Sequence, residues 1–340
     1  MEKTTGRNAA GNNFLPFENV KREILVKRQD GTPSEKYGCR PEDRKTEDLV
    51  NFGIINLDKP QGPTSHQVTS YVRDILKVKK CGHSGTLDPN VTGILPVAIG
   101  RATRIVQLLL TAGKEYVCLM HIHKDVEEKK LREVCAEFTG KIMQLPPVRS
   151  SVKRQLRERT VYYFELLEIN GKDVLFKVGT QAGTYIRKLV SDIGERIGGA
   201  HMVELRRTKA GPFSESDGTM ATLQDLADAY HYYTSEKNDK YIRKIILHVE
   251  KAVMHIPKIW ITDSAVESLC HGAPLHMPGV ARLESGIEKG DTIAIMTLKD
   301  EIVAYGKATE NSQKILKDEK GLAAKAEAVF MKEGTYPRMN

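Results

Sequence analysis

The chain has 340 residues, of which 40% are apolar and 28% are charged, a length and composition typical of a globular protein with two domains. Its formal net charge of +8 favours an anionic partner, either a nucleic acid or an acidic membrane surface. The five cysteines form no C-x-x-C pair and are odd in number, which argues against a zinc ribbon or a disulfide framework and favours a reducing compartment.

Several classes of protein are disfavoured by the absence of their sequence motifs. No run approaches 18 apolar residues, and the opening MEKTTGRNAAGNN has no apolar core, so we expect neither a membrane span nor a secretory signal. We therefore predict a cytoplasmic protein with no membrane partner. The Walker A, G-x-G-x-x-G and H-E-x-x-H patterns are also absent, which disfavours ATP, NAD and zincin chemistry.

The first half of the chain alternates between turn-rich and apolar segments. Residues 1–49 are polar and rich in turn residues, and we interpret them as an extended arm. FGIINLDKP at 52–60 predicts a short strand, and a helix capped by Thr64 or Ser65 should follow it. Further along we expect a helix at 102–110, a strand at 116–123 and a helix opened by a capping box of Asp125 and Glu128.

The second half predicts a change of architecture. Residues 160–180 read as a hairpin with its turn at NGK, and the next helix carries one apolar stripe: Ile186, Leu189, Val190, Ile193 and Ile197. Residues 50–255 should thus form an α+β domain. From 257 to 336 short strands alternate with glycine-containing or charged turns, which predicts a second domain built as a small β-barrel.

The stretch GHSGTLDPNVTG at 82–93 places Asp88 between a glycine-rich turn and a proline. One interpretation is a helix cap, with the Asp88 carboxylate as N-cap and Pro89 at the first helical position. The other is a reactive carboxylate at the mouth of a cleft. This stretch alone leaves both open.

Arg187 is unusual because of its expected place on a helix. If Thr184 caps that helix, Arg187 occupies the third helical position, where the helix dipole disfavours a cation. A carboxylate partner would resolve the conflict, and Asp88 is a candidate. The alternative is an arginine that reaches from the surface into solvent.

Basic residues gather in three places, which together favour contact with a phosphate backbone, although each alone could be a solvated face. Residues 149–160 contribute Arg149, Lys153, Arg154, Arg157 and Arg159. The other two groups are Arg206, Arg207 and Lys209, and Lys77, Lys79 and Lys80. Cys118, His121 and His123 predict no metal site, because on a strand the cysteine points away from both histidines.

Five blocks of sequence occur together and in order: LDKPQGPTSH at 57–66, GHSGTLDPNVTGILPVAIGRATR at 82–104, KEY at 114–116, GTYIRKLVSDIG at 183–194 and LRRTKAGPF at 205–213. Together they resemble the TruB-type pseudouridine synthase family across most of residues 50–255. YGCRPEDR in the arm, the segment from PPVRSS onward and a tail similar to a PUA domain, ending in GTYPR, resemble the archaeal and eukaryotic, dyskerin-like branch. The resemblance implies a mixed, mainly antiparallel sheet with flanking helices, followed by an RNA-binding PUA barrel on which the arm packs; the short tail favours an archaeal member.

The resemblance also implies roles for individual residues. Asp88 matches the aspartate nucleophile, Arg187 the arginine paired with it, and Tyr116 the tyrosine that stacks on the target base and is a candidate for removing its C5 proton. The remaining matches are the pocket residues Tyr185, Leu205 and His83, the last with a doubtful RNA contact, and the structural pair Lys59 and Pro60. A helix cap and a nucleophile are compatible roles for Asp88. No metal or organic cofactor is expected.

Family membership implies the conversion of uridine to pseudouridine in RNA by the catalytic subunit of a box H/ACA particle, in which a guide RNA selects the substrate RNA. The expected partners are small Nop-type and Gar-type proteins and a kink-turn-binding ribosomal-like protein that joins through the RNA. Two alternatives stay open: a stand-alone tRNA pseudouridine synthase acting in the TΨC loop, and a non-catalytic RNA-binding scaffold.

Overall fold

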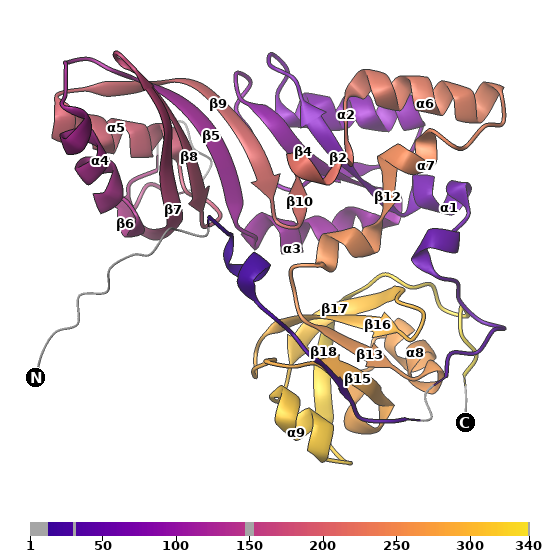
Figure 1. Ribbon diagram of the computed structural model, residues 1–340. Coiled ribbons are helices and arrows are strands. Elements are labelled where there is room, and N and C mark those ends of the chain that lie inside the picture. Colours follow the sequence, from indigo (N-terminus) through magenta and orange to yellow (C-terminus); the bar gives the residue numbers. More distant parts are fainter. Residues whose placement is uncertain (1–12, 30–31, 147–152, 339–340) are drawn as a thin grey trace, which may run out of the picture.

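The computed structural model describes residues 13–29, 32–146 and 153–338 (Figure 1). Two β-sheets organise these residues, and each has helices of its own. The larger sheet has the strand order β11-β2-β4-β9-β5-β8-β7-β6, with β3, β10 and β12 paired at its margins. Its pairs are antiparallel except for β11 with β2 and β4 with β9. The bounds are β2 Gly53–Lys59, β3 Cys81–His83, β4 Thr92–Ile99, β5 Lys114–Ile122, β6 Gly140–Gln144, β7 Arg157–Asn170, β8 Asp173–Thr180, β9 Ala200–Ala210, β10 Phe213–Ser214, β11 Met220–Ala221 and β12 Ile246–His248.

Helices cover this sheet in two groups that lie at opposite ends of it in Figure 1. One core lies where α4 and α5 pack on β5, β7 and β8, and another where α2 and α6 pack on β2 and β4. The helix bounds are α1 Thr46–Asn51, α2 Ser65–Leu76, α3 Val106–Thr111, α4 Glu128–Glu137, α5 Ile186–Ile197, α6 Leu223–Ser235 and α7 Ile242–Ile245.

The helix starts show where local sequence rules suffice. The predicted cap of α2 is confirmed: the Thr64 hydroxyl accepts a hydrogen bond from the Gln67 amide at 3.2 Å, and the Gln67 side-chain oxygen accepts one from the Thr64 backbone N–H at 2.8 Å. The predicted box of Asp125 and Glu128 is wrong, because α4 begins at Glu128 itself and Asp125 instead lies 3.8 Å from the ammonium of Lys172. The segment 102–110 is helical, but its first turn is a 3₁₀ helix, Gly100–Ile105, ahead of α3.

The C-terminal sheet has the strand order β1-β15-β13-β16-β17-β18-β14 and encloses its own apolar core. Its first strand, β1, comes from the N-terminal arm, so segments near the two ends of the chain belong to one sheet. The bounds are β1 Ile24–Val26, β13 Lys258–Ile261, β14 Leu275–His276, β15 Val280–Glu284, β16 Thr292–Thr297, β17 Ile302–Ala308 and β18 Leu322–Val329, with helices α8 Asp263–Cys270 and α9 Ser312–Lys317.

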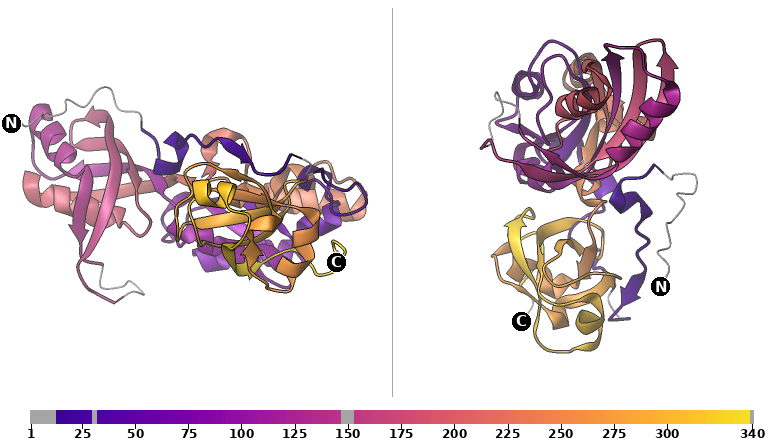
Figure 2. Two further views of the ribbon diagram at one scale, coloured as in Figure 1. Left: turned by 90° about the horizontal axis from the view of Figure 1, so that it is seen from below. Right: turned by 90° about the vertical axis from the view of Figure 1, so that its left-hand side faces the viewer.

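The arm contacts both parts of the molecule (Figure 2). The Leu15 side chain is fully buried, and Glu18 forms an ion pair with Lys209 of the larger sheet. Strand β1 then pairs antiparallel with β15 of the C-terminal sheet. Gly38 lies so close to Tyr336 that a Cβ there would collide with its hydroxyl. The arm therefore ties the C-terminal sheet to the larger one.

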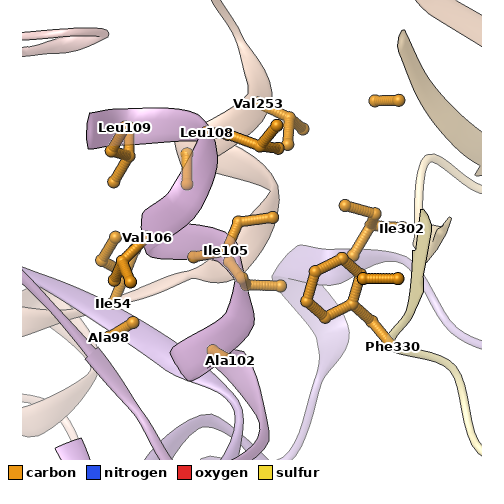
Figure 3. Close-up of a cluster of buried hydrophobic side chains, with 14 of the residues drawn as sticks. Ile54, Ala98, Ala102, Ile105, Val106, Leu108, Leu109, Val253, Ile302 and Phe330 are labelled. Carbon is orange, nitrogen blue, oxygen red and sulfur yellow. The ribbon is translucent and has the colours of Figure 1, made fainter. Parts of the chain in front are cut away.

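A shared apolar core joins the two parts directly. In Figure 3, Ile105 and Leu108 of the larger part and Ile302 and Phe330 of the C-terminal part belong to one buried cluster. At the edge of this cluster the Arg101 guanidinium stacks over the Phe52 ring, with its Cζ atom 4.5 Å from the ring centre. Because apolar burial is the main driving force for association, this contact fixes how the two parts sit together. No helix among the described residues is long and apolar enough to cross a membrane.

A buried ion pair lies beside this shared core. Arg44 of the arm donates two hydrogen bonds, at 2.9 and 3.1 Å, to the carboxylate of Glu250. Burial by itself raises the pKa of Glu250, but hydrogen bonds from His248 and Arg44 and the Arg44 charge outweigh it and hold the pKa at about 2. The backbone N–H of Ile302, from the C-terminal sheet, donates to the same carboxylate at 3.1 Å. Glu250 thus links all three parts of the chain.

Replacing Arg44 by Met should destabilise the fold by about 3–5 kcal/mol, because it leaves the buried Glu250 carboxylate without a counter-ion. Urea denaturation followed by circular dichroism measures the loss. The matched control is Arg73→Met, which removes an exposed pair with Asp74 and should shift the midpoint little. Equal effects of the two substitutions would contradict the linking role of Glu250.

Candidate active site

Asp88 lies in the loop between β3 and β4, and it does not cap a helix. Its carbonyl accepts a hydrogen bond from the Val91 amide at 3.0 Å, so residues 88–91 form a turn, and β4 begins at Thr92. The predicted cap is therefore wrong. Pairing of β4 with β2, which starts opposite Lys59 at Gly93, extends the chain directly after the turn and leaves no room for a helix.

Lys59 holds this turn from below. Its side chain is fully buried, and its ammonium donates to the carbonyls of Pro60, Pro89 and Val91 at 2.8, 3.1 and 2.9 Å. Burial lowers the pKa of Lys59, and the Asp88 charge acts in the opposite direction. The Lys59–Pro60 pair thus fixes the backbone that carries Asp88.

Arg187 approaches Asp88 from α5. Its Nη2 donates to Asp88 Oδ2 at 2.7 Å, across 99 residues of sequence, and both side chains are about half exposed. The expected Thr184 cap is wrong, because the Thr184 hydroxyl donates to the Gln181 carbonyl instead. Tyr185 is the N-cap, so Arg187 is the second helical residue, and the Asp88 carboxylate offsets its unfavourable place near the positive end of the dipole.

The Gln144 side chain anchors the start of α5. Its carbonyl oxygen accepts from the Tyr185 amide at 3.0 Å, and its amide donates to the Tyr185 carbonyl at 3.2 Å. Sequence analysis missed Gln144, which ends β6 without any local signal of this long-range contact. A cavity of about 70 Å³ opens here, lined by Gln144, Pro146, Arg157, Arg159, Gly183 and Tyr185.

Tyr116 and Leu205 lie on the neighbouring strands β5 and β9. Both are half-buried and pack against the core under α4 and α5. Tyr116 is paired in register with Arg207, and Leu205 with Cys118. The two side chains are therefore partly core and partly accessible.

His83 ends β3 close to the same loop. Its Nδ1 accepts a hydrogen bond from the Gly85 amide at 3.3 Å, and its ring meets that of His66 edge to face, with ring centres 4.9 Å apart. Burial lowers the pKa of His83 to about 4, and the charges of His66 and Arg207 act in the same direction. The imidazole is therefore neutral at neutral pH and offers no charge to a phosphate.

Part of the basic segment predicted to bind RNA lines the cavity beside Tyr185. Lys153 and Arg154 are exposed, and Arg157 and Arg159 are half-buried in the cavity wall. Within the described part of the chain none of the four forms an ion pair with a carboxylate, so their charges are available to a polyanion. Arg149 lies outside the described residues.

The second predicted basic group, residues 206–209, is not a free basic surface. Arg206 donates twice to Asp58 and pairs with Glu215, Lys209 pairs with Glu18, and Arg207 is buried. The interpretation as a phosphate-binding surface is wrong for this group, because carboxylates neutralise Arg206 and Lys209 and Arg207 is buried; of these carboxylates Asp58 and Glu18 lie far away in sequence. A count of local charges cannot detect such partners.

Cys118 is fully buried in the middle of β5, whereas His123 is exposed and follows the last residue of that strand. His123 Nε2 lies 2.9 Å from His201 Nδ1, and His121 Nδ1 lies 2.7 Å from Asp173. Over the residues that the structure describes, no group of three or more His, Cys, Asp or Glu side chains is arranged to hold a metal ion.

Four family models match the chain in succession. They are the DKCLD (NUC011) domain over 14–69, the TruB family pseudouridylate synthase N-terminal domain over 73–129 and 122–186, the tRNA pseudouridylate synthase B C-terminal domain over 187–254, and the PUA domain over 257–330. Together they define a two-part, RNA-modifying class of protein with a C-terminal RNA-binding module.

Individual relatives match over nearly the whole chain. A "Probable tRNA pseudouridine synthase B" of Pyrococcus abyssi is 55% identical over 96% of this chain and 97% of its own, and a namesake of Nanoarchaeum equitans is 54% identical over 96% and 92%. A solved Cbf5-Nop10-Gar1 complex contains a chain with 54% identity and a TM-score of 0.92, covering 96% of this chain and 99% of that one. An H/ACA RNP bound to a substrate RNA contains one with 52% identity and a TM-score of 0.90, covering 95% and 98%.

The chain belongs to the TruB family of pseudouridylate synthases, and it is an RNA pseudouridine synthase, an isomerase. The predicted family, fold class and PUA domain are confirmed by these matches.

The low pKa of His83 predicts a stability that depends on pH. The unfolded chain takes up a proton on this imidazole near pH 6.5, whereas the folded chain does so only near pH 4. The contribution is therefore fully present above about pH 6.5 and is lost as the pH falls toward 4. In His83→Gln the thermal unfolding midpoint should fall less steeply as the pH is lowered from 6.5 to 4. An unchanged dependence of the midpoint on pH would contradict the low pKa of His83.

Proposed function

We propose that this protein isomerises uridine to pseudouridine in ribosomal RNA as the catalytic subunit of a box H/ACA guide ribonucleoprotein, with Asp88 as the nucleophile. The observation that carries the proposal is the contact between Asp88 and Arg187, which joins a fixed loop to the start of α5 in a solvent-accessible position. Exposed ion pairs add little to stability, so the pair has no evident structural need. The solved relatives, by their titles, are parts of an H/ACA RNP and of a Cbf5-Nop10-Gar1 complex.

The reaction requires a carboxylate that forms and then breaks one bond. An oxygen of Asp88 attacks the sugar or the base as the N1–C1′ bond breaks, and the freed base turns so that C5 faces C1′. The C5–C1′ bond forms as the bond to Asp88 breaks; the C5 proton leaves and N1 gains a proton. The sequence is redox-neutral. Arg187 holds the carboxylate ready, since a guanidinium within hydrogen-bonding distance favours the ionised form.

The half-buried side chains that the family resemblance assigns to the substrate pocket suit the recognition of a single base. A target uridine must leave its helix to reach Asp88, and stacking on Tyr116 would compensate by about 1–3 kcal/mol. The Tyr116 phenol is also our candidate for removing the C5 proton. Tyr185 and Leu205, each half-buried, would line the pocket for the flipped base.

Glycoside hydrolysis would need a second carboxylate opposite Asp88. Asp192, on the same helix as Arg187, forms an ion pair with Lys188 and lines a separate cavity with Glu137 and Phe138. Asp192 lies on the side of α5 that faces α4, so it does not serve as a second carboxylate opposite Asp88. This geometry favours isomerisation over hydrolysis.

We infer that the protein assembles with a guide RNA, small Nop-type and Gar-type proteins and, through the RNA, a kink-turn-binding ribosomal-like protein. The unpaired basic residues 153–159 and the C-terminal PUA domain, held rigidly by the arm and by the shared core, would give the RNA two contacts at a fixed separation. We also infer a cytoplasmic location, which the five unpaired thiols favour.

A second candidate is a stand-alone tRNA pseudouridine synthase acting in the TΨC loop without a guide. The observation that favours it is the name of the relatives that are 52–55% identical, probable tRNA pseudouridine synthase B. A non-catalytic RNA scaffold is disfavoured, because a scaffold has no need of the accessible pair of Asp88 and Arg187.

Tritium release from RNA labelled at uridine C5 tests the proposal. We expect release only with a matching guide RNA and the small partner proteins, and its loss in Asp88→Asn, which keeps the shape but removes the charge. Asp192→Asn is the matched control, because it removes a carboxylate from α5 outside the site; it should keep most of the rate. Release from tRNA without a guide would favour the stand-alone enzyme. Tight RNA binding with no release from either RNA would leave only the scaffold.

The basic segment gives an independent prediction for RNA binding. Lys153→Gln and Arg154→Gln should each weaken guide RNA binding and reduce the slope of log affinity against log salt by about one, if each side chain contacts a phosphate. Filter binding from 50 to 300 mM salt measures the slope. The control is Arg132→Gln on α4, whose charge is already paired with Glu128. An unchanged slope for both test variants would exclude this segment from the interface.

A further inference from the structure

Ser65, the first residue of α2, binds both backbone groups of Leu87, the residue just before Asp88. Its hydroxyl oxygen accepts a hydrogen bond from the Leu87 N–H at 2.8 Å, and its O–H donates to the Leu87 carbonyl at 3.1 Å. Ser65 is fully buried, and Leu87 is 4% exposed. Because water cannot replace these two bonds in the interior, they hold the peptide group that Leu87 shares with Asp88 against the start of α2.

The start of α2 is itself fixed. Thr64 closes it with the capping box described above, and the Thr69 hydroxyl, one turn further on, donates to the Ser65 carbonyl at 2.8 Å. Val68 and Val72 hold the inner face of the helix in the apolar core over β2 and β4. Ser65 therefore carries its hydroxyl on a rigid element, as a residue that positions another must.

The backbone on the other side of Asp88 is held separately. The Pro89 carbonyl accepts hydrogen bonds from the Lys59 ammonium at 3.1 Å and from the Gly62 amide at 2.9 Å. Lys59 ends β2, Gly62 lies in the turn that follows, and Ser65 begins the next helix, so one short segment holds the chain before and after Asp88. The Asp88 side chain extends from between these two anchors and is about half exposed.

The contact between Asp88 and Arg187 depends on the place of the Asp88 backbone. Asp88 Oδ2 lies 2.7 Å from Arg187 Nη2. Hydrogen bonds of this kind reach to about 3.2 Å, so a shift of about 1 Å in the backbone would break the contact. Further upstream, Arg207 binds the Gly85 carbonyl at 3.2 Å, but that carbonyl lies three residues before Asp88. The bonds from Ser65 act on the residue next to it.

We propose that Ser65 is a positioning residue for the reaction: its hydroxyl holds the peptide group between Leu87 and Asp88, and so keeps the carboxylate at the place where it meets Arg187. This inference rests on the proposed function, in which Asp88 is the nucleophile. Ser65 is buried and touches no substrate; it acts through the backbone of Leu87. Reacting groups profit from being held in this way, because a misplacement of about 1 Å can cost about 100-fold in rate.

Ser65→Ala tests the inference, because it removes the hydroxyl without adding bulk. Single-turnover tritium release by the complete particle should slow roughly 10- to 100-fold, since the chain before Asp88 loses its nearest anchor. The affinity of the same particle for substrate RNA, measured by filter binding, should stay within about twofold, because a buried residue makes no contact with RNA. An unchanged rate, or a loss confined to RNA affinity, would overturn the inference.

Thr297→Val is the matched control for the loss of a buried hydroxyl. The Thr297 hydroxyl, in the C-terminal sheet, is fully buried and accepts hydrogen bonds from the N–H groups of Lys299 and Glu301, both at 3.2 Å. Its removal should lower the thermal unfolding midpoint but leave the rate of tritium release unchanged. Equal slowing of the two variants would show that the rate follows general stability, which would overturn the specific role of Ser65.

Amide hydrogen exchange in Ser65→Ala tests the anchor without any activity. The Val91 amide donates to the Asp88 carbonyl and closes the turn that carries the carboxylate. The inference predicts faster exchange at Leu87 and at Val91, whereas the amides of β9 should exchange as in the wild type. Unchanged exchange at Val91 would show that Lys59 holds the turn unaided, and the inference would be wrong.

The two proposals fail in different ways. A wild-type rate of tritium release in Asp88→Asn would refute the proposed function, because the carboxylate would not be needed. The exchange experiment requires no substrate, so it would still decide whether Ser65 holds the turn at Asp88.

Discussion

The need to solvate buried positive charge governs the site. Lys59, Lys114 and Arg207 are all buried, and main-chain carbonyls replace the water that each lost on folding. Leaving an interior cation unsolvated costs several kcal/mol, so the carbonyls cannot move away from it. The turn at 88–91, the loop at Gly85 and the end of α3 are consequently held at fixed places, and the first of them carries Asp88.

The same logic extends to the junction between the two parts of the chain. Glu250 is buried there with Arg44 of the arm and a backbone N–H of the C-terminal sheet, next to an apolar core to which both parts contribute. A junction built this way resists bending, because bending would expose apolar surface and separate a buried ion pair. An RNA held by the C-terminal domain would then meet Asp88 at a constant distance.

Some features determined by neighbouring residues were predictable, although the local caps expected at Asp125 and Thr184 are wrong. The predicted cap of α2, which is Thr64, and the buried stripe of α5 follow from spacing along the chain, and both are present. Several predictions failed where the partners are distant in sequence, although the pairing of Asp88 with Arg187 was anticipated and is present. Asp88 begins a turn because β2 pairs with the strand that follows it, and Arg206 is neutralised by Asp58, 148 residues away. Gln144 and Arg207 gave no local signal, since their partners lie far away in sequence, at the start of α5 for Gln144 and in β4 and the loop before it for Arg207.

The sequence by itself determined the family, the two-domain order, the basic character of residues 153–159 and the identity of the side chains at the site. These properties are carried by residue types and their order, which need no folding to be recognised. Only the tertiary structure decided which charged side chains are free to bind a ligand and which are paired or buried within the protein. Burial and pairing depend on contacts between distant segments, and those contacts leave Asp88 and Arg187 accessible to a substrate while they bury Arg207.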